Sequence, residues 1–118
     1  SVYAAVLAQS GHQVVVVANA QSAISAADAA APDLVILELQ LACHSGLEFL
    51  YEFRSYPEWQ HIPVIIHSLV PQSEFAGQWR MLRDRLAVTD YLYKPLTSLK
   101  HLDNAVQAVA ASADILSA

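Results

Sequence analysis

The sequence predicts an α/β fold in which a parallel sheet is covered by helices on both faces. Two observations predict it. Short apolar runs rich in β-branched residues alternate with segments of helical periodicity, and the connections between them are too short for anything but β–α–β crossovers. Because 118 residues suffice for one compact domain and not for two, we expect a single doubly wound domain over residues 1–118.

A helix and a strand open the chain. Residues 1–10 place apolar side chains on one side of a helix, and Gly11 ends it. Residues 12–18 contain four consecutive valines, Val14–Val17, a run typical of a strand that is buried on both faces of a parallel sheet.

The second helix and strand follow directly. Residues 20–31 predict a helix of small residues, which Pro32 ends. Residues 34–39 (LVILEL) predict a second buried strand, interrupted only by Glu38.

A third helix and strand come next. Residues 46–55 have apolar side chains at helical spacing, and residues 64–66 form a short β-branched strand that ends at His67 and Ser68. Ser73 is suited to cap a helix that runs as far as Leu86, because apolar residues recur there every three or four positions.

The last predicted strand covers residues 91–93, and Lys94 and Pro95 end it. Ser98 then caps the final helix. We expect the apolar residues of that helix to face inward: Leu99, Leu102, Val106 and Val109.

Composition excludes several classes of protein. With 55% hydrophobic and 14% charged residues the chain has the reverse of a disordered composition. The lone Cys43 excludes a disulfide framework and fits a reducing compartment. No apolar run approaches the roughly 18 residues of a membrane span, and we see no export leader, so we expect a cytoplasmic protein without a membrane partner. The net charge of −5 argues against nucleic acid as a direct partner.

Three polar residues stand at strand ends: Glu38, Ser68 and Lys94. Ligand chemistry in parallel sheets occurs at the carboxyl ends of the strands. A carboxylate there is costly unless it has a partner or a purpose, and Lys94 is a natural partner. Carboxylate, hydroxyl and ammonium together match the needs of an aspartyl-phosphate switch: a nucleophile, a donor to a phosphoryl oxygen and a charge clamp.

The segments PDLVILELQLACHSGLEFL, IPVIIHS and DYLYKP resemble bacterial response-regulator receiver domains of the CheY-like type. The resemblance covers nearly the whole chain. It implies a flavodoxin-like sheet of order 2-1-3-4-5 and a role in two-component phosphorelay signalling, with a histidine kinase or an output domain as protein partner and no enzymatic activity of its own.

The resemblance also assigns roles to individual residues. Glu38 stands at the phosphoacceptor position, Ser68 and Tyr91 at the two switch positions, and Lys94 at the conserved lysine. The backbone carbonyl of Gln40 stands where the family has a magnesium ligand.

The chain departs from the family pattern at several positions. The acceptor is glutamate instead of aspartate, Ala42 replaces a proline, Ala87 replaces a glycine, and the stretch from Ser68 to Tyr91 is longer than usual. The family's first strand and its metal-binding acidic pair are missing from the sequence, so we expect an N-terminally incomplete domain. Either the natural chain is longer, or another segment fills the central place of the sheet.

Three interpretations of Glu38 remain open: a buried structural partner of Lys94, a fixed mimic of the phosphorylated state, and a working acceptor. Ser68 is equally suited to cap its strand, and Tyr91 to pack in the core. Glutamate carries its charge one methylene farther out, which makes it a poor nucleophile in a site built for aspartate.

The leading hypothesis is therefore a degenerate pseudo-receiver that acts through protein–protein interaction, without a cofactor. The alternative is an active phosphoacceptor, which would bind Mg²⁺ if the site is intact.

Other chemistries find little support. A flavodoxin-like enzyme or cofactor binder would need a Gly-rich phosphate loop, which is absent from the sequence. His44 and His67 lack metal-ligand spacing, and Cys43 lacks an orienting partner for catalysis. The arginines of one helix mark either its solvated face or a surface for an acidic partner: Arg80, Arg83 and Arg85.

We also expect a homo-oligomer. Receivers of this type commonly pair through the face of the fourth helix, fifth strand and fifth helix, and here that face has mixed charge. Its residues are Trp79, Arg80, Arg83, Asp90, Lys100 and Asp103. The missing central strand supplies a second reason, because the edges of Val14–Val17 and Leu34–Leu37 would be unpaired.

Overall fold

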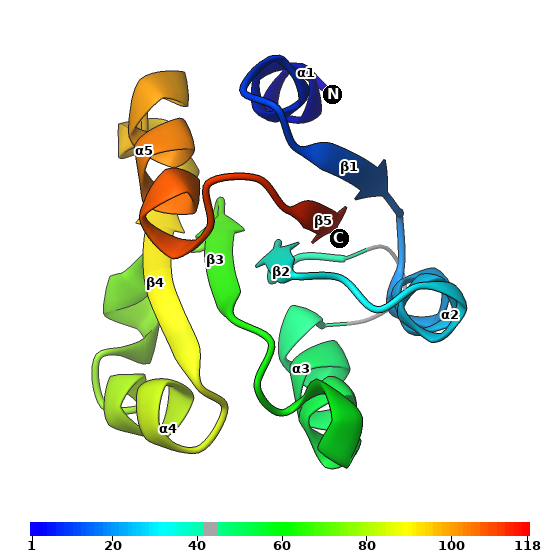
Figure 1. Cartoon of the computed structure of the whole chain (residues 1–118). Helices are drawn as coiled ribbons and strands as arrows, with labels where there is room; N and C mark the ends of the chain where they lie inside the picture. The colour runs from blue at the N-terminus through cyan, green and yellow to red at the C-terminus, as the bar shows by residue number, and fades with distance from the viewer. Residues whose placement is uncertain (42–44) are drawn as a thin grey trace.

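Five parallel strands form one sheet in the order β1-β5-β2-β3-β4 (Figure 1). The strands are β1 (Gln13–Val16), β2 (Leu34–Leu37), β3 (Val64–Ser68), β4 (Val88–Tyr93) and β5 (Asp114–Ser117). The computed structural model describes residues 1–41 and 45–118, so the interpretations of Ala42, Cys43 and His44 lie outside the described residues. The predicted parallel sheet is confirmed.

Helices cover both faces of this sheet (Figure 1). The helices α1 (Val2–Gln9) and α5 (Leu99–Val109) lie on one face. The other face carries α2 (Ala20–Ala29), α3 (Gly46–Ser55) and α4 (Trp79–Asp84). Three short 3-10 helices complete the fold: η1 (Pro57–Trp59), η2 (Gln72–Phe75) and η3 (Lys94–Leu96). Within the described residues, no helix has both the length and the apolarity to cross a membrane.

The helix boundaries follow from local chemistry. Gly11 ends α1 with a φ of 96°, a conformation in which glycine is favoured because it has no Cβ. Ser98 caps α5 as predicted, its hydroxyl accepting a hydrogen bond of 3.0 Å from the backbone N–H of His101. Asn19 caps α2 in the same way through Ser22.

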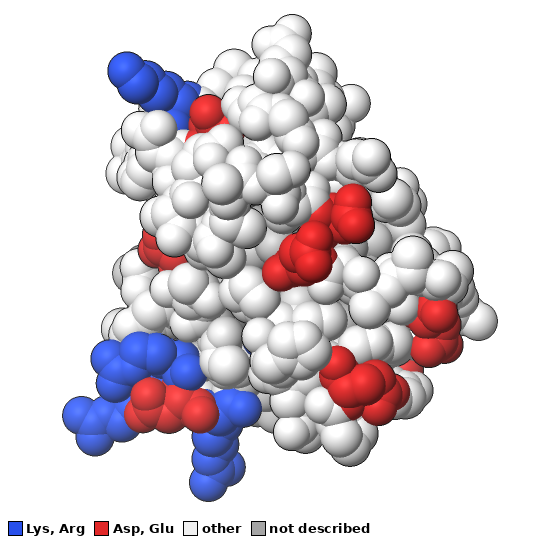
Figure 2. All heavy atoms as spheres, in the orientation of Figure 1, with Lys and Arg blue, Asp and Glu red and all other residues white. Residues whose placement is uncertain are grey.

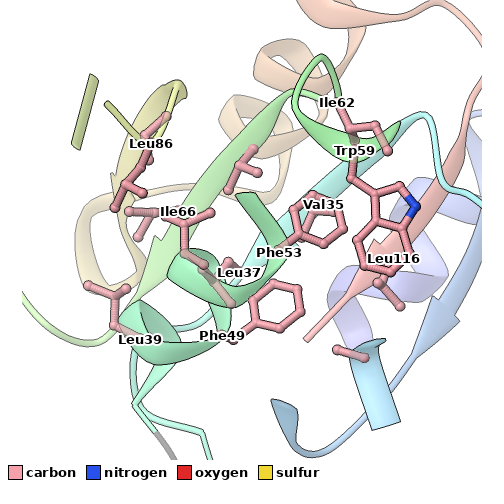
Figure 3. Close-up of a cluster of buried hydrophobic side chains, with 14 of the residues drawn as sticks. Val35, Leu37, Leu39, Phe49, Phe53, Trp59, Ile62, Ile66, Leu86 and Leu116 are labelled. Atoms are coloured by element: carbon pink, nitrogen blue, oxygen red, sulfur yellow. The ribbon is translucent and has the colours of Figure 1, made fainter. Parts of the chain in front are cut away.

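Two hydrophobic cores lie on the two faces of the sheet. Figure 3 shows the larger one, in which Phe49 and Phe53 of α3 pack between Val35, Leu37 and the ring of Trp59. The smaller core joins Leu7 of α1 and Leu102 and Val106 of α5 to the opposite face of the strands. Because β2 contributes alternate residues to both cores, it is buried along its whole length.

The strand β5 was not predicted from the sequence. It fills the central position of the sheet, pairing Ile115 with Val14 of β1 on one side and with Leu34 of β2 on the other. The predicted unpaired edge of Leu34–Leu37 is therefore wrong, because another segment of the chain covers it. The same pairing covers one edge of β1 and leaves its other edge outside the sheet.

The prediction that Val14–Val17 is buried on both faces is also wrong. In β1 the residues Val15 and Val16 are 55% and 54% exposed. The reason is topological: β1 is the edge strand of the sheet, where fewer neighbouring elements cover the side chains. A buried strand and an apolar edge strand therefore have the same sequence signature.

The segment after β3 differs from the prediction as well. Ser73 does not cap a long helix, because the chain forms η2 and then a turn around Gly77 before α4 begins at Trp79. The apolar spacing still marks the buried side, since Leu82 and Leu86 are buried. In α5, Leu99 lies in the first turn and is 38% exposed instead of inward-facing.

Candidate functional site

Three neighbouring strands bring the predicted site residues together at the carboxyl edge of the sheet. Glu38 follows β2, Ser68 is the last residue of β3, and Lys94 follows β4 as the first residue of η3. Because β2, β3 and β4 are adjacent and parallel, their ends converge. The side chains of Glu38 and Lys94 are 14% and 22% exposed, and Ser68 is completely buried.

The carboxylate of Glu38 accepts hydrogen bonds from four donors. Its Oε1 atom lies 2.9 Å from Nζ of Lys94 and 3.1 Å from the backbone N of Leu69. Its Oε2 atom accepts from the hydroxyl of Ser68 and, at 3.2 Å, from the backbone N of Gln40. Each oxygen therefore has two donors, which leaves the carboxylate with little unused capacity.

These contacts favour the ionised carboxylate. Burial alone would raise the pKa of Glu38, but the hydrogen bonds from Ser68, Lys94, Gln40 and Leu69 outweigh burial and hold the pKa below the ordinary 4.5. Glu38 is therefore a charged, paired group at neutral pH.

The backbone around Glu38 is fixed from both sides. Its N–H donates to the carbonyl of Ala118, which follows β5, at 2.7 Å. On the other side, Gly46 at the start of α3 donates to the carbonyl of Leu39 at 2.8 Å. A β-carbon at position 46 would lie 2.7 Å from Cα of Leu39 and against the carbonyl oxygen of Glu38, so this close approach requires glycine.

A hydrogen-bonded path leads from Glu38 to the edge strand β4. Ser68 donates to Glu38 and accepts from the backbone N of Val70 at 2.9 Å. The carbonyl of Val70 in turn accepts from the hydroxyl of Tyr91 at 2.5 Å. Tyr91 is 7% exposed and contacts the rings of Phe75 and Trp79. Burial, together with the charge of Glu38, raises the pKa of Tyr91 to about 12, so its hydroxyl stays protonated and able to donate.

The other side of the site contains two residues that sequence reasoning did not assign to it. Nζ of Lys94 lies 5.6 Å from the ring centre of Tyr3 in α1, a cation–π contact. The ring of Tyr3 meets the ring of His67 edge-on at 4.6 Å. His67 is 3% exposed and its Nε2 atom has no hydrogen-bond partner among the described residues.

His67 is neutral in the fold. Burial, together with the positive charge of Lys94, lowers its pKa to about 4. His67 therefore packs against α1 as an uncharged aromatic ring, which agrees with its lack of metal-ligand spacing in the sequence. Tyr3 gave no signal either, because a tyrosine on the apolar side of a helix looks like core packing.

The described residues do not fit a magnesium site. A pocket of about 230 Å³ adjoins Glu38, Gln40 and Lys94. Mg²⁺ prefers several oxygen ligands, but Glu38 is already engaged by four donors and the ammonium of Lys94 occupies one side. Within residues 1–41 and 45–118, no group of three His, Cys, Asp or Glu side chains could hold a metal ion. The predicted role of the Gln40 carbonyl as a magnesium ligand stays untested.

The predicted arginine cluster lies away from this site. Figure 2 shows Lys and Arg side chains gathered at the lower left, over α4, with an acidic side chain between them. Arg83 pairs with Asp84 at 3.0 Å, and both side chains are more than half exposed. This agrees with a solvated helix face, and the acidic-partner alternative stays a prediction.

Comparison with known proteins gives consistent matches. The model of the response regulator receiver domain family matches residues 1–107. A sensor histidine kinase of Ectopseudomonas mendocina, TmoS, is 30% identical over 87 residues; these residues make up 74% of the chain but only 8% of the kinase. The chain thus spans a small part of that relative.

Solved structures show the same fold. The receiver domain of NtrX from Brucella abortus superposes with a TM-score of 0.74 and 27% identity, covering 92% of this chain and 86% of that one. The chemotaxis protein CheY4 of Vibrio cholerae gives a TM-score of 0.77 at 19% identity, with the same coverage. The receiver domain of the sensor histidine kinase PA1611 of Pseudomonas aeruginosa, with magnesium in its active-site cleft, gives 0.71 at 22% identity, covering 91% of this chain and 84% of that one.

Proposed function

Because the chain belongs to the response regulator receiver domain family, we propose that it is a degenerate receiver in which Glu38 replaces the phosphoryl group. In the family the switch serine moves toward the phosphoryl group and the switch aromatic responds. Here a permanent carboxylate already binds the serine and the lysine, so the domain works as an interaction module that needs no phosphorylation.

One observation carries this proposal: Ser68, Lys94 and the N–H of Leu69 all donate to the same carboxylate. These are the hydroxyl and the cation that a phosphoryl group would attract, and an additional backbone donor. Glu38 projects farther than aspartate, so its oxygens reach these donors directly. Hydrogen bonds through Val70 then connect Ser68 to the buried Tyr91 of β4.

The same contacts oppose phosphorylation. A carboxylate that accepts from four donors must lose some of them before it can attack a phosphodonor. Among the described residues that line the pocket beside Glu38, no other Asp or Glu side chain is present to help hold Mg²⁺. We therefore propose that the domain has no acceptor chemistry and no enzymatic activity.

Receiver domains interact with histidine kinases and output domains. We propose that this domain has a protein partner of that kind and forms a homo-oligomer in the cytoplasm of a bacterium. Support comes from family membership and from the similarity to a histidine kinase, TmoS. The alternative, an active phosphoacceptor, would require Glu38 to give up some of its four donors.

The chemical test uses acetyl phosphate with Mg²⁺ and intact-mass detection. We expect an unchanged chain mass, while an aspartate-bearing receiver in a parallel reaction gains a phosphoryl group. A stable acyl-phosphate on this chain would overturn the proposal and establish the active alternative.

A second test separates a phosphoryl mimic from a purely structural ion pair. Glu38→Gln removes the charge, and we expect it to shift the NMR signals of Val70, Tyr91 and the Trp79 indole. The matched control is Glu52→Gln, at an exposed position of α3, which should leave these signals in place. Shifts confined to Ser68 and Lys94 would mean that Glu38 only stabilises the fold.

A further inference from the structure

The strand β1 has an open outer edge. Among the described residues it pairs only with β5. Gln13 and Val17 donate their backbone N–H groups to the carbonyls of Ala113 and Ser117 on the β5 side. Because a strand alternates with a period of two, the N–H and C=O groups of Val14 and Val16 point the other way, out of the sheet.

Nothing on this edge opposes pairing with another strand. The sequence of β1, QVVV, contains no charge and no proline, and its register with β5 is regular. The opposite edge, β4, differs in charge and in register: its register shifts beside Val64, it carries the exposed Asp90, and the Asp90 carboxylate accepts from the N–H of Tyr91 at 2.8 Å. One edge of the sheet is thus protected and the other is not.

Apolar side chains flank the open edge on both faces of the sheet. Val15 and Val16 project to opposite faces and are 55% and 54% exposed. Beside Val15 lies an apolar pocket of about 340 Å³ between β1, β5 and α2, lined in part by Ala26, Ala29 and Leu116. Exposed valines beside an apolar hollow are costly in a monomer and become buried when a second strand is added.

We propose that β1 pairs antiparallel with β1 of a second copy of this chain, which joins two five-stranded sheets into one. The outward groups of Val14 and Val16 are placed symmetrically about Val15. A two-fold axis at Val15 therefore sets Val14 opposite the partner's Val16, and the reverse, so that each pair exchanges two hydrogen bonds. Val15 then faces the partner's Val15 at the close, non-hydrogen-bonded position.

The pattern favours a second copy over a foreign strand. The edge is its own complement in hydrogen bonding, shape and polarity. Each copy also carries a net charge of −5, so two copies repel each other least where the contacting strands are uncharged. This pairing is independent of the proposed phosphoryl mimicry at Glu38, which lies at the carboxyl end of the sheet.

Light scattering after size-exclusion chromatography tests the pairing at micromolar concentration. We expect the unmodified chain at about twice the chain mass of 12.8 kDa. Val15→Lys places two like charges face to face and should halve the mass. Because Val15 is already half exposed, the lysine reaches solvent in the monomer. The matched control is Leu96→Lys, at an 82% exposed leucine beside β4, which should leave the dimer intact.

Two further experiments test the strand pairing itself. Val16→Pro removes an outward N–H, leaves the N–H groups that donate to β5 in place, and should also halve the mass. An equal mixture of the Val15→Lys and Val15→Glu chains should restore the dimer, because opposite charges then meet across the axis. The proposal is overturned if the unmodified chain is monodisperse near 12.8 kDa, or if Leu96→Lys and not Val15→Lys dissociates it. The latter result would assign the interface to the face of α4, β4 and α5.

Discussion

At the scale of single residues, Glu38 is a hydrogen-bond acceptor on which donors from three segments converge. Ser68 and Leu69 come from the end of β3, Lys94 from the end of β4, and the N–H of Gln40 from its own loop. Such a group fixes the relative positions of three strand ends. Removing the carboxylate of Glu38 should therefore lower the stability of the fold as well as change signalling.

The pair of Glu38 and Lys94 gives the first prediction at this scale. Lys94→Ala leaves a largely buried carboxylate without its cation, and we expect a loss of about 2 kcal/mol in the free energy of unfolding, less than for a fully buried pair. The combined change Glu38→Gln with Lys94→Met should cost much less, since both charges leave together. Urea denaturation of the three proteins measures this difference. A neutral Lys94→Ala would show that the ion pair adds nothing to the fold.

Some of these residues could be predicted from the sequence and others could not. Glu38, Ser68 and Lys94 stand at the ends of apolar runs, and parallel strands bring such ends together. The N–H groups of Leu69 and Gln40 have no sequence signature, because every residue except proline carries one. Tyr3 and His67 were missed because their contacts depend on how α1 packs against the sheet.

At the scale of elements, β5 shows where periodicity fails. Its two buried residues, Ile115 and Leu116, are too short an apolar run to mark a strand. They become a central strand because the fold leaves a place between β1 and β2. The four valines of β1 make the opposite case, since a strong strand signal does not tell an edge strand from a central one.

The contact between α3 and the loop after β2 gives the prediction at this scale. Gly46→Ala forces a methyl group against the carbonyl of Glu38 and Cα of Leu39, both of them backbone atoms that move only with the site. We expect a loss of about 2 kcal/mol in stability, as for overpacking in a core, together with shifted NMR signals at Glu38 and Ser68.

Gly77→Ala is the matched control for this change. A β-carbon there has no neighbouring atom within 4 Å, and the φ of Gly77 is not positive. We expect an unchanged or slightly higher melting temperature, because alanine restricts the unfolded chain more than glycine does. Equal losses in the two variants would show that the close approach at Glu38 does not set the cost of Gly46→Ala.

At the scale of the whole molecule, stability depends on pH through two neighbouring groups, Glu38 and His67, that line the same pocket. His67 lies in the core formed with α1, and Glu38 lies at the carboxyl edge. Both have a pKa below the ordinary value in the folded protein. In each case the unfolded chain takes up a proton at a higher pH than the folded chain does, so acid favours unfolding.

The two groups act in different pH windows. The pKa of His67 is about 4 in the fold against 6.5 in the unfolded chain, so its contribution to stability declines as the pH falls from 6.5 to 4. A shift of this size corresponds to about 3 kcal/mol over the window. The stability that Glu38 supplies is present above its unfolded pKa of 4.5, and it is lost as the pH falls through its lower folded pKa.

Replacing His67 by leucine separates these windows. His67→Leu keeps an apolar side chain against Tyr3 and removes the proton-binding ring, so we expect the free energy of unfolding to change little between pH 6.5 and pH 4.5. The decline at lower pH, which belongs to Glu38, should remain. Denaturant melts at half-unit steps of pH measure both slopes, and His101→Leu at an exposed position of α5 should keep the slope of the unmodified chain. If His67→Leu keeps the full decline above pH 4.5, His67 is not the group that titrates there, and its ring must gain a proton in the fold as readily as in the unfolded chain.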